Sequence, residues 1–127
     1  MQWYEKDPER FELERYVVRQ HHLRTKWVIL EGRMRLRAKY RGRRDTYLTE
    51  VLYPPRYPHD KPRGFVLRPK LRASPHQLGP NEPCLEHGQW SPATTGAVWL
   101  NWFVEWLRAY EMYLDTGKWP DPDEVTY

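Results

Sequence analysis

Residues 27–41 read WVILEGRMRLRAKYR. Every second position from Arg33 to Arg41 carries Arg or Lys, and the positions between them are apolar or aromatic. This period of two predicts β-strands that bury one face and leave the other face in water. Glu31-Gly32 offers a turn that divides the stretch into two strands. We expect the buried face to consist of Val28, Leu30, Met34, Leu36, Ala38 and Tyr40.

Two more strands are predicted downstream of this stretch. Residues Arg41–Asp45 have the glycine and charged residues of a turn, and they precede an expected strand over Thr46–Tyr53. Phe65–Leu67 is predicted as a fourth, short strand, because Gly64 and Pro69 bound it. Four sequential strands with turns between them indicate an antiparallel meander.

A first helix is expected over Asp7–Gln20, ahead of the strands. Asp7 can cap this helix, and Pro8 suits its first turn, where its missing N–H costs nothing. Tyr16–Val18 would also suit a strand, because β-branched and aromatic residues favour sheets. The spacing of the apolar residues nevertheless favours the helix.

A second and longer helix is expected over Thr95–Leu114. Thr94 or Thr95 can cap its start, and Gly117 can end it. Large apolar side chains recur there every three or four residues, so we expect one face to pack on the sheet rather than hold a cofactor. These side chains are Val98, Trp99, Trp102, Phe103, Trp106, Tyr110 and Tyr113. Helix, meander and helix in this order indicate the α+β class.

Length and composition limit the classes of protein. The 127 residues suit one domain, residues 1–127, and seven Trp, nine Tyr and three Phe can build an aromatic core. The net charge of +4 allows acidic partners without favouring nucleic acid. No stretch approaches the roughly 18 apolar residues of a membrane helix, and no leader pattern is visible. A single cysteine cannot form an internal disulfide, so we expect the reducing cytoplasm.

The only cysteine, Cys84, lies in a polar, proline-containing run. Residues 81–93 read NEPCLEHGQWSPA. A lone cysteine is more often a small buried apolar residue than a nucleophile. Here the polar surroundings predict an accessible sulfur instead, and a thiolate is a strong nucleophile. Cys84 is therefore the candidate for covalent chemistry.

Three features, in this order, resemble the ubiquitin-conjugating enzyme family. Tyr53–Pro58 (YPPRYP), followed by Pro62, is similar to the proline-rich punctuation that ends the family's third strand. Cys84 follows at close to the family's usual interval, and Gln89–Ala93 (QWSPA) matches the corner before its long helix. The resemblance covers roughly Lys26–Leu114. It implies the ubiquitin-conjugating fold, with an irregular active-site segment before the last helix and with Cys84 as a thioester-forming nucleophile.

The sequence departs from the family pattern ahead of Cys84. The family has His-Pro-Asn there, whereas this chain has Ser74-Pro75-His76, so the asparagine that supports the oxyanion is missing. His76 can donate a ring N–H in its place, Asn81 can reach in from nearer the thiol, and His87 can accept a proton. We take Cys84 and His76 as the catalytic pair. Each of these helpers is also an ordinary loop residue.

The chain looks trimmed, because the segment from Cys84 to Trp90 is short and little follows Trp119-Pro120. In this it resembles bacterial ubiquitin-conjugating-like proteins of antiphage operons of the cyclic-oligonucleotide-based signalling type. The resemblance implies that the cargo is the C-terminus of a ubiquitin-like protein or of a cyclic-oligonucleotide synthase. A separate enzyme would activate it with ATP, since no nucleotide-binding loop is visible. We expect no cofactor and no metal, because scattered histidines and one cysteine lack ligand spacing.

Two rival functions follow from other features. The basic residues between Arg33 and Arg44 can bind phosphates, which keeps a nucleic-acid-binding domain as an alternative. A charged strand face is more often simply solvated, which makes a nucleic-acid partner the less favoured alternative. The other rival is a catalytically silent adaptor of the same fold, in which Cys84 has no chemical role.

Overall fold

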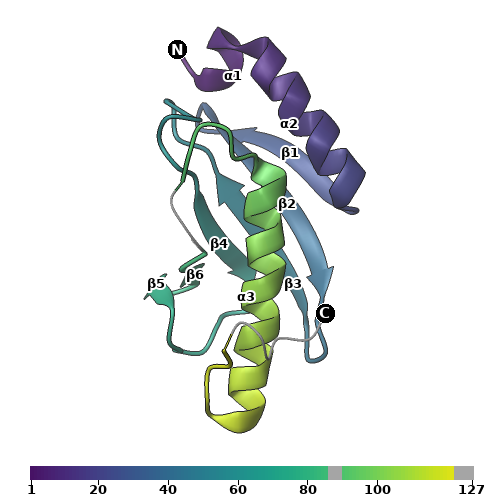
Figure 1. Ribbon diagram of the computed structural model, residues 1–127, viewed down its shortest axis with the longest axis vertical. Helices are drawn as coiled ribbons and strands as arrows, with labels where there is room; N and C mark the ends of the chain where they lie inside the picture. The colour runs from purple at the N-terminus through teal and green to yellow at the C-terminus, as the bar shows by residue number, and fades with distance from the viewer. Residues whose placement is uncertain (86–89, 122–127) are drawn as a thin grey trace.

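The computed structural model describes residues 1–85 and 90–121, which form an α+β arrangement (Figure 1). The helices are α1 (Trp3–Lys6), α2 (Pro8–His21) and α3 (Gly96–Thr116). The strands are β1 (Thr25–Leu30), β2 (Arg33–Arg41), β3 (Thr46–Leu52), β4 (Arg63–Arg68), β5 (Gln77–Gly79) and β6 (Glu82–Pro83). The first four strands form one antiparallel sheet in the order β1-β2-β3-β4, which confirms the predicted meander.

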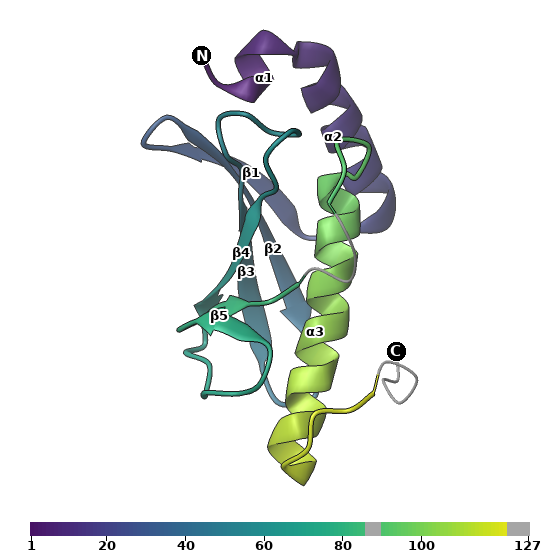
Figure 2. The same cartoon turned by 60° about the vertical axis from the view of Figure 1, so that its left-hand side comes forward.

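The molecule has two layers. Helices α2 and α3 lie on the same face of the sheet, and in the part of the chain described above no helix covers the opposite face (Figure 2). The aromatic and aliphatic core lies between α3 and the sheet, with Leu36, Val51 and Phe103 fully buried. Strands β5 and β6 form a separate hairpin beside β4. No helix of the described residues has the length and apolar character needed to span a bilayer.

The hairpin between β1 and β2 corrects the predicted buried face. Its turn consists of Glu31 and Gly32, both with positive φ (54° and 74°), as a tight type I′ connection requires. A two-residue turn pairs odd positions of β1 with even positions of β2, so Trp27 lies opposite Leu36. Side chains of directly opposed residues share a face. Trp27 therefore packs on the core, and the assignment of Val28 and Leu30 to the buried face was wrong.

Helix α2 matches the first predicted helix within one residue at each end. The Asp7 carboxylate accepts the backbone N–H of Arg10 at 3.0 Å, and Pro8 occupies the first turn. The short helix α1 was not predicted. Its Trp3 is 2% exposed and packs against the rings of Tyr53 and Tyr57, with centroid distances of 5.1 and 4.8 Å. Because this contact joins residues far apart in the sequence, local periodicity could not reveal it.

Helix α3 carries the largest apolar stripe of the fold. Buried side chains recur along it at Trp99, Phe103, Trp106 and Tyr110, as the helical spacing predicted. The helix ends at Gly117, whose φ of 77° suits glycine at a C-terminal cap. Its start differs from the prediction, because the side chain of the N-cap residue, Thr95, makes no capping hydrogen bond. A distant carboxylate takes that role.

Candidate active site

Cys84 directly follows β6 and is partly exposed. Its backbone N–H donates to the carbonyl oxygen of His76 at 2.8 Å, which continues the pairing of β5 with β6 by one residue. The thiol is thus carried at the end of a small hairpin rather than within the main sheet. The residue is partly exposed, and the accessibility of its sulfur stays a prediction.

The β5–β6 hairpin is fixed to β4 through Asn81. This residue adopts a left-handed φ of 57°, and its backbone carbonyl accepts the N–H of Val66 at 2.8 Å. Its side-chain amide donates to the carbonyls of Val66 (2.7 Å) and Pro69 (3.3 Å), while Oδ1 accepts the N–H of Leu71 at 3.1 Å. Both amide hydrogens are therefore engaged by the backbone. Asn81 holds the hairpin in place and does not offer the thiol a donor.

A side-chain pair adds a second tie between the hairpin and β4. The guanidinium of Arg63 donates to both carboxylate oxygens of Glu82, at 3.0 and 2.8 Å. This hydrogen bonding raises the pKa of Arg63 above its usual value. Two parallel bonds fix the direction of the pair as well as its distance. The residue two positions before the thiol is therefore held firmly.

His76 lies beside the thiol segment through its backbone. The carbonyl that receives the Cys84 N–H also accepts the indole N–H of Trp106 on α3, at 2.9 Å. The φ of His76 is 61°, in the left-handed region. Its imidazole ring is exposed and packs against Trp119, with ring centroids 5.1 Å apart. His76 thus joins the hairpin, α3 and the residues that follow α3.

Leu85 anchors the residue after the thiol in the core. It is 2% exposed, and its Cδ1 lies over Gly64 of β4, where an added Cβ would stand only 2.6 Å away. The same site lies close to the ring of Phe103. Cys84 is therefore held between a backbone hydrogen bond and a buried side chain. The predicted helper His87 lies outside the described residues.

Trp90 links the corner before α3, residues 90–93, to the segment that follows β3. Its indole N–H donates to the carbonyl of Pro58 at 2.8 Å, and its ring lies between Tyr57 and Trp99, at 5.8 and 5.7 Å. Residues from two sequence motifs, YPPRYP and WSPA, therefore meet in space.

Arg10 of α2 fixes the same corner from the other side. Its guanidinium donates to the carbonyls of Pro92 (2.6 Å) and Thr94 (2.8 Å) and to the hydroxyl of Tyr57 (3.1 Å). It also pairs with the buried Glu14, four residues further along the helix. This role of Arg10 was not predicted from the sequence. The only local signal was the spacing of four between an arginine and a glutamate.

Glu14 completes the link between α2 and α3. Burial raises the pKa of its carboxyl, although hydrogen bonds from Gly96, Tyr57 and Tyr53 and the charge of Arg10 oppose the shift. The hydroxyl of Tyr53 donates to its Oε1 at 3.2 Å. A buried carboxylate is costly unless donors surround it, and these donors come from three separate segments.

The basic strand face is partly neutralised by Glu50. Arg35 and Arg37 of β2 each donate to one of its oxygens at 3.0 Å, and the carboxylate side chain is only 4% exposed. A carboxylate buried between two arginines reduces the positive potential along the basic face of β2. This arrangement weakens the nucleic-acid alternative.

Among residues 1–85 and 90–121, no three His, Cys, Asp or Glu side chains gather closely enough to ligate a metal ion together. The contacts described around Cys84 are therefore those of its own backbone with His76 and of its neighbour Leu85 with the core.

Comparison with known proteins identifies a family. A family model described as "Type II CBASS E2 protein" matches residues 14–126. No curated protein and no solved structure matches the chain.

Proposed function

The chain belongs to the family of type II CBASS E2 proteins, trimmed E2-like proteins of antiphage operons, and we propose that it is a thioester-forming transferase with Cys84 as nucleophile. In this proposal, residues 1–127 act as one ubiquitin-conjugating-like domain in the cytoplasm. The single observation that carries it is the placement of the only cysteine, partly exposed and held at the end of the β5–β6 hairpin.

The placement of Cys84 suits transfer between thioesters. Its backbone bond to His76 and the buried side chain of Leu85 hold the residue on both sides. A fixed nucleophile loses less entropy when it meets a bound acyl group. Exchange between thioesters replaces one bond with another of similar energy, so a strongly activated nucleophile is not required.

The reaction has two balanced steps. In the first, the Cys84 thiolate attacks the carbonyl carbon of the cargo thioester, and the thiolate of the activating enzyme leaves. In the second, a deprotonated amine attacks the new thioester, and the Cys84 thiolate leaves as the amide forms. The proton of the amine passes to solvent or to a neighbouring base. ATP is used only by the separate activating enzyme.

We assign His76 the role of oxyanion donor in place of the family's asparagine. Each step passes through a tetrahedral oxyanion that a ring N–H can stabilise. The His76 carbonyl lies 2.8 Å from the Cys84 amide nitrogen, so the two residues are neighbours, and the His76 ring is exposed. Its contact with Trp119 limits the directions in which the ring can point.

The proposed cargo is the C-terminus of a ubiquitin-like protein or of a cyclic-oligonucleotide synthase. The test is co-expression of the chain with the proteins encoded beside it, followed by a non-reducing gel. The wild-type chain should form an adduct that thiol reductants remove. Cys84→Ser should trap the acyl group as an ester that resists reductant and yields to hydroxylamine, and Cys84→Ala should form no adduct.

The controls separate the rival functions. An adduct that persists in Cys84→Ala would contradict the proposed nucleophile. Partner binding without any adduct in the wild-type chain would indicate an adaptor instead. For His76, the variant His76→Gly keeps the left-handed backbone without a ring and should slow transfer, whereas His76→Asn should restore it. Equal rates for these two variants would remove the oxyanion role.

A further inference from the structure

Two buried aromatic side chains of α3 form hydrogen bonds outside the helix. The indole N–H of Trp106 donates to the carbonyl of His76 at 2.9 Å, and the hydroxyl of Tyr110 accepts the backbone N–H of Arg72 at 2.8 Å. We call Trp106 and Tyr110 the aromatic pair; they are 4% and 3% exposed. Both of their partners belong to residues 69–76, between β4 and β5, which we call the bridging segment.

The bridging segment depends on side chains for its hydrogen bonds. It forms neither helix nor strand, so its backbone groups need other partners. Asn81 Oδ1 accepts the N–H of Leu71 at 3.1 Å, and the side chain of Gln77 donates to the carbonyl of Arg72 at 2.9 Å. The aromatic pair adds two bonds from the side of α3. The position of the segment therefore depends on α3 as well as on the β5–β6 hairpin.

The last residue of the bridging segment bonds directly to the residue of the thiol. The His76 carbonyl accepts the Cys84 backbone N–H at 2.8 Å and the Trp106 indole N–H at 2.9 Å. A carbonyl oxygen has two lone pairs, so both bonds form at once. The backbone of Cys84 is therefore linked to α3 through one shared oxygen atom.

Aromatic neighbours fix the ring of Trp106. It stacks on Tyr110, with ring centroids 5.2 Å apart and an interplanar angle of 12°, because residues four apart lie on the same side of a helix. Trp119, which follows the helix, packs against Trp106 at 5.4 Å and against the ring of His76 at 5.1 Å. A donor on a ring that is held in this way can set the position of its acceptor.

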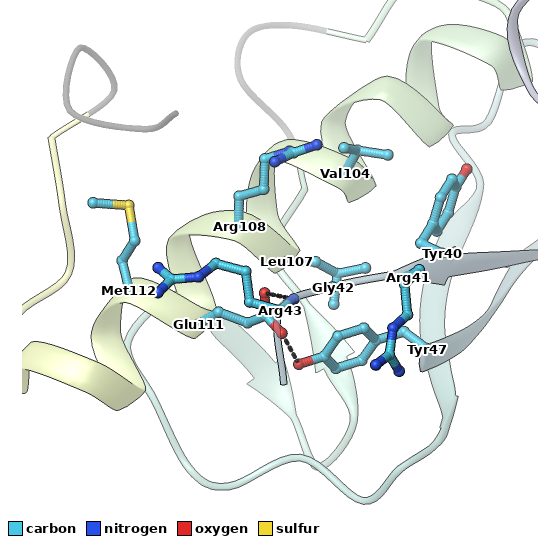
Figure 3. Close-up of a pocket in the computed structure, with 10 residues that line it drawn as sticks. All are labelled: Tyr40, Arg41, Gly42, Arg43, Tyr47, Val104, Leu107, Arg108, Glu111 and Met112. Carbon is cyan, nitrogen blue, oxygen red and sulfur yellow. Dashed lines mark hydrogen bonds between the residues drawn. The ribbon is translucent and has the colours of Figure 1, made fainter. Parts of the chain in front are cut away.

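Helix α3 is itself fixed to the sheet beside the aromatic pair. Glu111, the residue after Tyr110, accepts the backbone N–H of Arg43 and the hydroxyl of Tyr47, both at 2.9 Å (Figure 3). Glu111 is 4% exposed, and a buried carboxylate is costly without its donors. Movement of the helix along the sheet would break these bonds. The aromatic pair therefore stands on a firm support.

Two other buried tryptophans have no such bond. Within the described residues, the indole N–H groups of Trp3 and Trp99 are buried without an acceptor. Burial of a tryptophan in this core therefore does not by itself lead to a partner for its N–H. The bond from Trp106 is a specific property of the helix position beside the bridging segment.

We propose that Trp106 and Tyr110 are positioning residues of Cys84 that act through the bridging segment. Trp106 holds the His76 carbonyl that receives the Cys84 N–H, and Tyr110 holds the segment nearer its start. The inference rests on the proposed thioester transfer, in which a nucleophile that is already fixed loses less entropy when it meets the acyl group. Neither side chain touches the cargo or moves a proton in this role. It gives α3 a part in the proposed reaction.

The first test is amide hydrogen exchange of the purified chain, resolved by residue with NMR. Trp106→Phe keeps an aromatic ring but removes the donor. Exchange at the Cys84 amide should become about tenfold faster, because loss of a buried hydrogen bond shifts local opening by about that factor. Exchange is expressed relative to the amide of Leu36, a fully buried residue of β2 that reports opening of the whole domain. A merely structural role of Trp106 would accelerate both amides alike.

A second variant tests the other member of the aromatic pair. Tyr110→Phe removes only the hydroxyl that accepts the Arg72 N–H. Exchange should become faster at the Arg72 amide and, by a smaller factor, at the Cys84 amide. This variant loses a single oxygen atom, so it keeps the inference testable even where Trp106→Phe does not fold.

Trp3→Phe is the matched control. It makes the same substitution at a buried tryptophan whose N–H has no acceptor in the described part of the chain, and α1 lies at the end of the molecule away from β5 (Figure 1). Exchange at Cys84 relative to Leu36 should remain at the wild-type value. With the co-expressed neighbouring proteins, the thiol-sensitive adduct should accumulate about threefold more slowly in Trp106→Phe than in Trp3→Phe.

The inference is overturned by exchange at Cys84 that rises no more than exchange at Leu36, or that rises equally in Trp106→Phe and Trp3→Phe. Unchanged exchange at Arg72 and Cys84 in Tyr110→Phe would overturn it too, as would adduct formation at equal rates in Trp106→Phe and the control. A wild-type chain that forms no adduct contradicts the proposed transfer instead. The exchange measurements then still decide whether α3 holds the thiol residue.

Discussion

A carboxylate on α2 caps the helix that follows the active-site segment: Glu14 Oε1 accepts the backbone N–H of Gly96 at 2.8 Å. The two residues are far apart in sequence, and the contact brings the start of α3 against α2. Orphan N–H groups at a helix start need acceptors, and Glu14 supplies one here in place of a Thr95 side chain.

Removal of the Glu14 carboxylate should destabilise the fold strongly. Its side chain is 0% exposed, and its carboxylate accepts hydrogen bonds from Arg10, Tyr53 and Gly96. Glu14→Ala leaves these donors buried without their acceptor, so the free energy of unfolding should fall by about 3 kcal/mol. Urea denaturation measures the change. Glu12→Ala, on the exposed side of α2, should change it by less than about 0.5 kcal/mol; similar losses for both variants would contradict the buried role.

Stability should fall in mild acid because of His22. Its Nε2 donates to the carbonyl of Ala97 at 3.1 Å, so neutral Nδ1 accepts the hydroxyl of Tyr40 at 3.2 Å. Burial lowers the pKa of His22 below its ordinary 6.5, although the bond to Ala97 opposes this shift.

The unfolded chain therefore takes up the proton first as the pH falls. The contribution of His22 to the free energy of unfolding is complete above about pH 6.5. Below that pH it decreases by at most about 1.4 kcal/mol per pH unit until the folded state also protonates. Chemical denaturation between pH 7.5 and 5 should show this slope in the wild-type chain, reduced in His22→Gln and retained in His21→Gln. An unchanged slope in His22→Gln would assign the effect to another group.

A side chain at position 64 should disturb the residue next to the thiol. A Cβ on Gly64 would stand 2.6 Å from Leu85 Cδ1 and 2.8 Å from an edge carbon of the Phe103 ring. Gly64→Ala should therefore cost about 1–3 kcal/mol of stability and displace Leu85. Thermal unfolding measures the first effect, and the rate of Cys84 alkylation by iodoacetamide measures the second.

Gly79 provides the matched control for this substitution. An added Cβ there meets nothing within 4 Å, so Gly79→Ala in β5 should leave both readouts close to the wild-type values. An alkylation rate in Gly64→Ala equal to that of Gly79→Ala would show that Leu85 does not position the thiol segment.

Neutralising Glu50 should expose the charge of the basic strand face. Arg35 and Arg37 would lose their shared counter-charge, so Glu50→Gln should cost about 1–3 kcal/mol of stability. It should also strengthen salt-sensitive binding to single-stranded DNA, measured by fluorescence polarisation at two salt concentrations. Glu31→Gln makes the same charge change in the exposed β1–β2 turn. Equal DNA binding by the two variants would mean that Glu50 does not reduce the positive charge of the basic strand face.

Much of the backbone was predictable from local pattern. The alternation from Arg33 to Arg41 and the helical spacing from Trp99 to Tyr110 each report which face of one element is apolar, and both predictions were confirmed. The position of the β1–β2 turn was also predicted correctly. The buried face of β1 was predicted wrongly. The two-residue turn decides whether the odd or the even positions of β1 lie opposite the buried residues of β2.

Some features of the candidate site were likewise predictable from the sequence, and others were not. Sequence alone identified Cys84 as the only thiol and placed it in an accessible, irregular segment between the sheet and the last helix. It could not assign the role of Asn81, which was a candidate oxyanion donor. The structure shows that the Asn81 amide instead donates to the backbone of β4 and of the segment after it. A side chain's partners depend on which distant segments surround it.

The sequence by itself determined the elements, their order and the one residue capable of thiol chemistry, because periodicity, turn residues and composition are local properties. Only the tertiary structure decided that Arg10 and Glu14 hold the corner before α3, and that Glu50 neutralises two arginines. The physical reason is that buried charges are stable only when donors and acceptors from separate segments converge on them, and that convergence exists only in the folded chain.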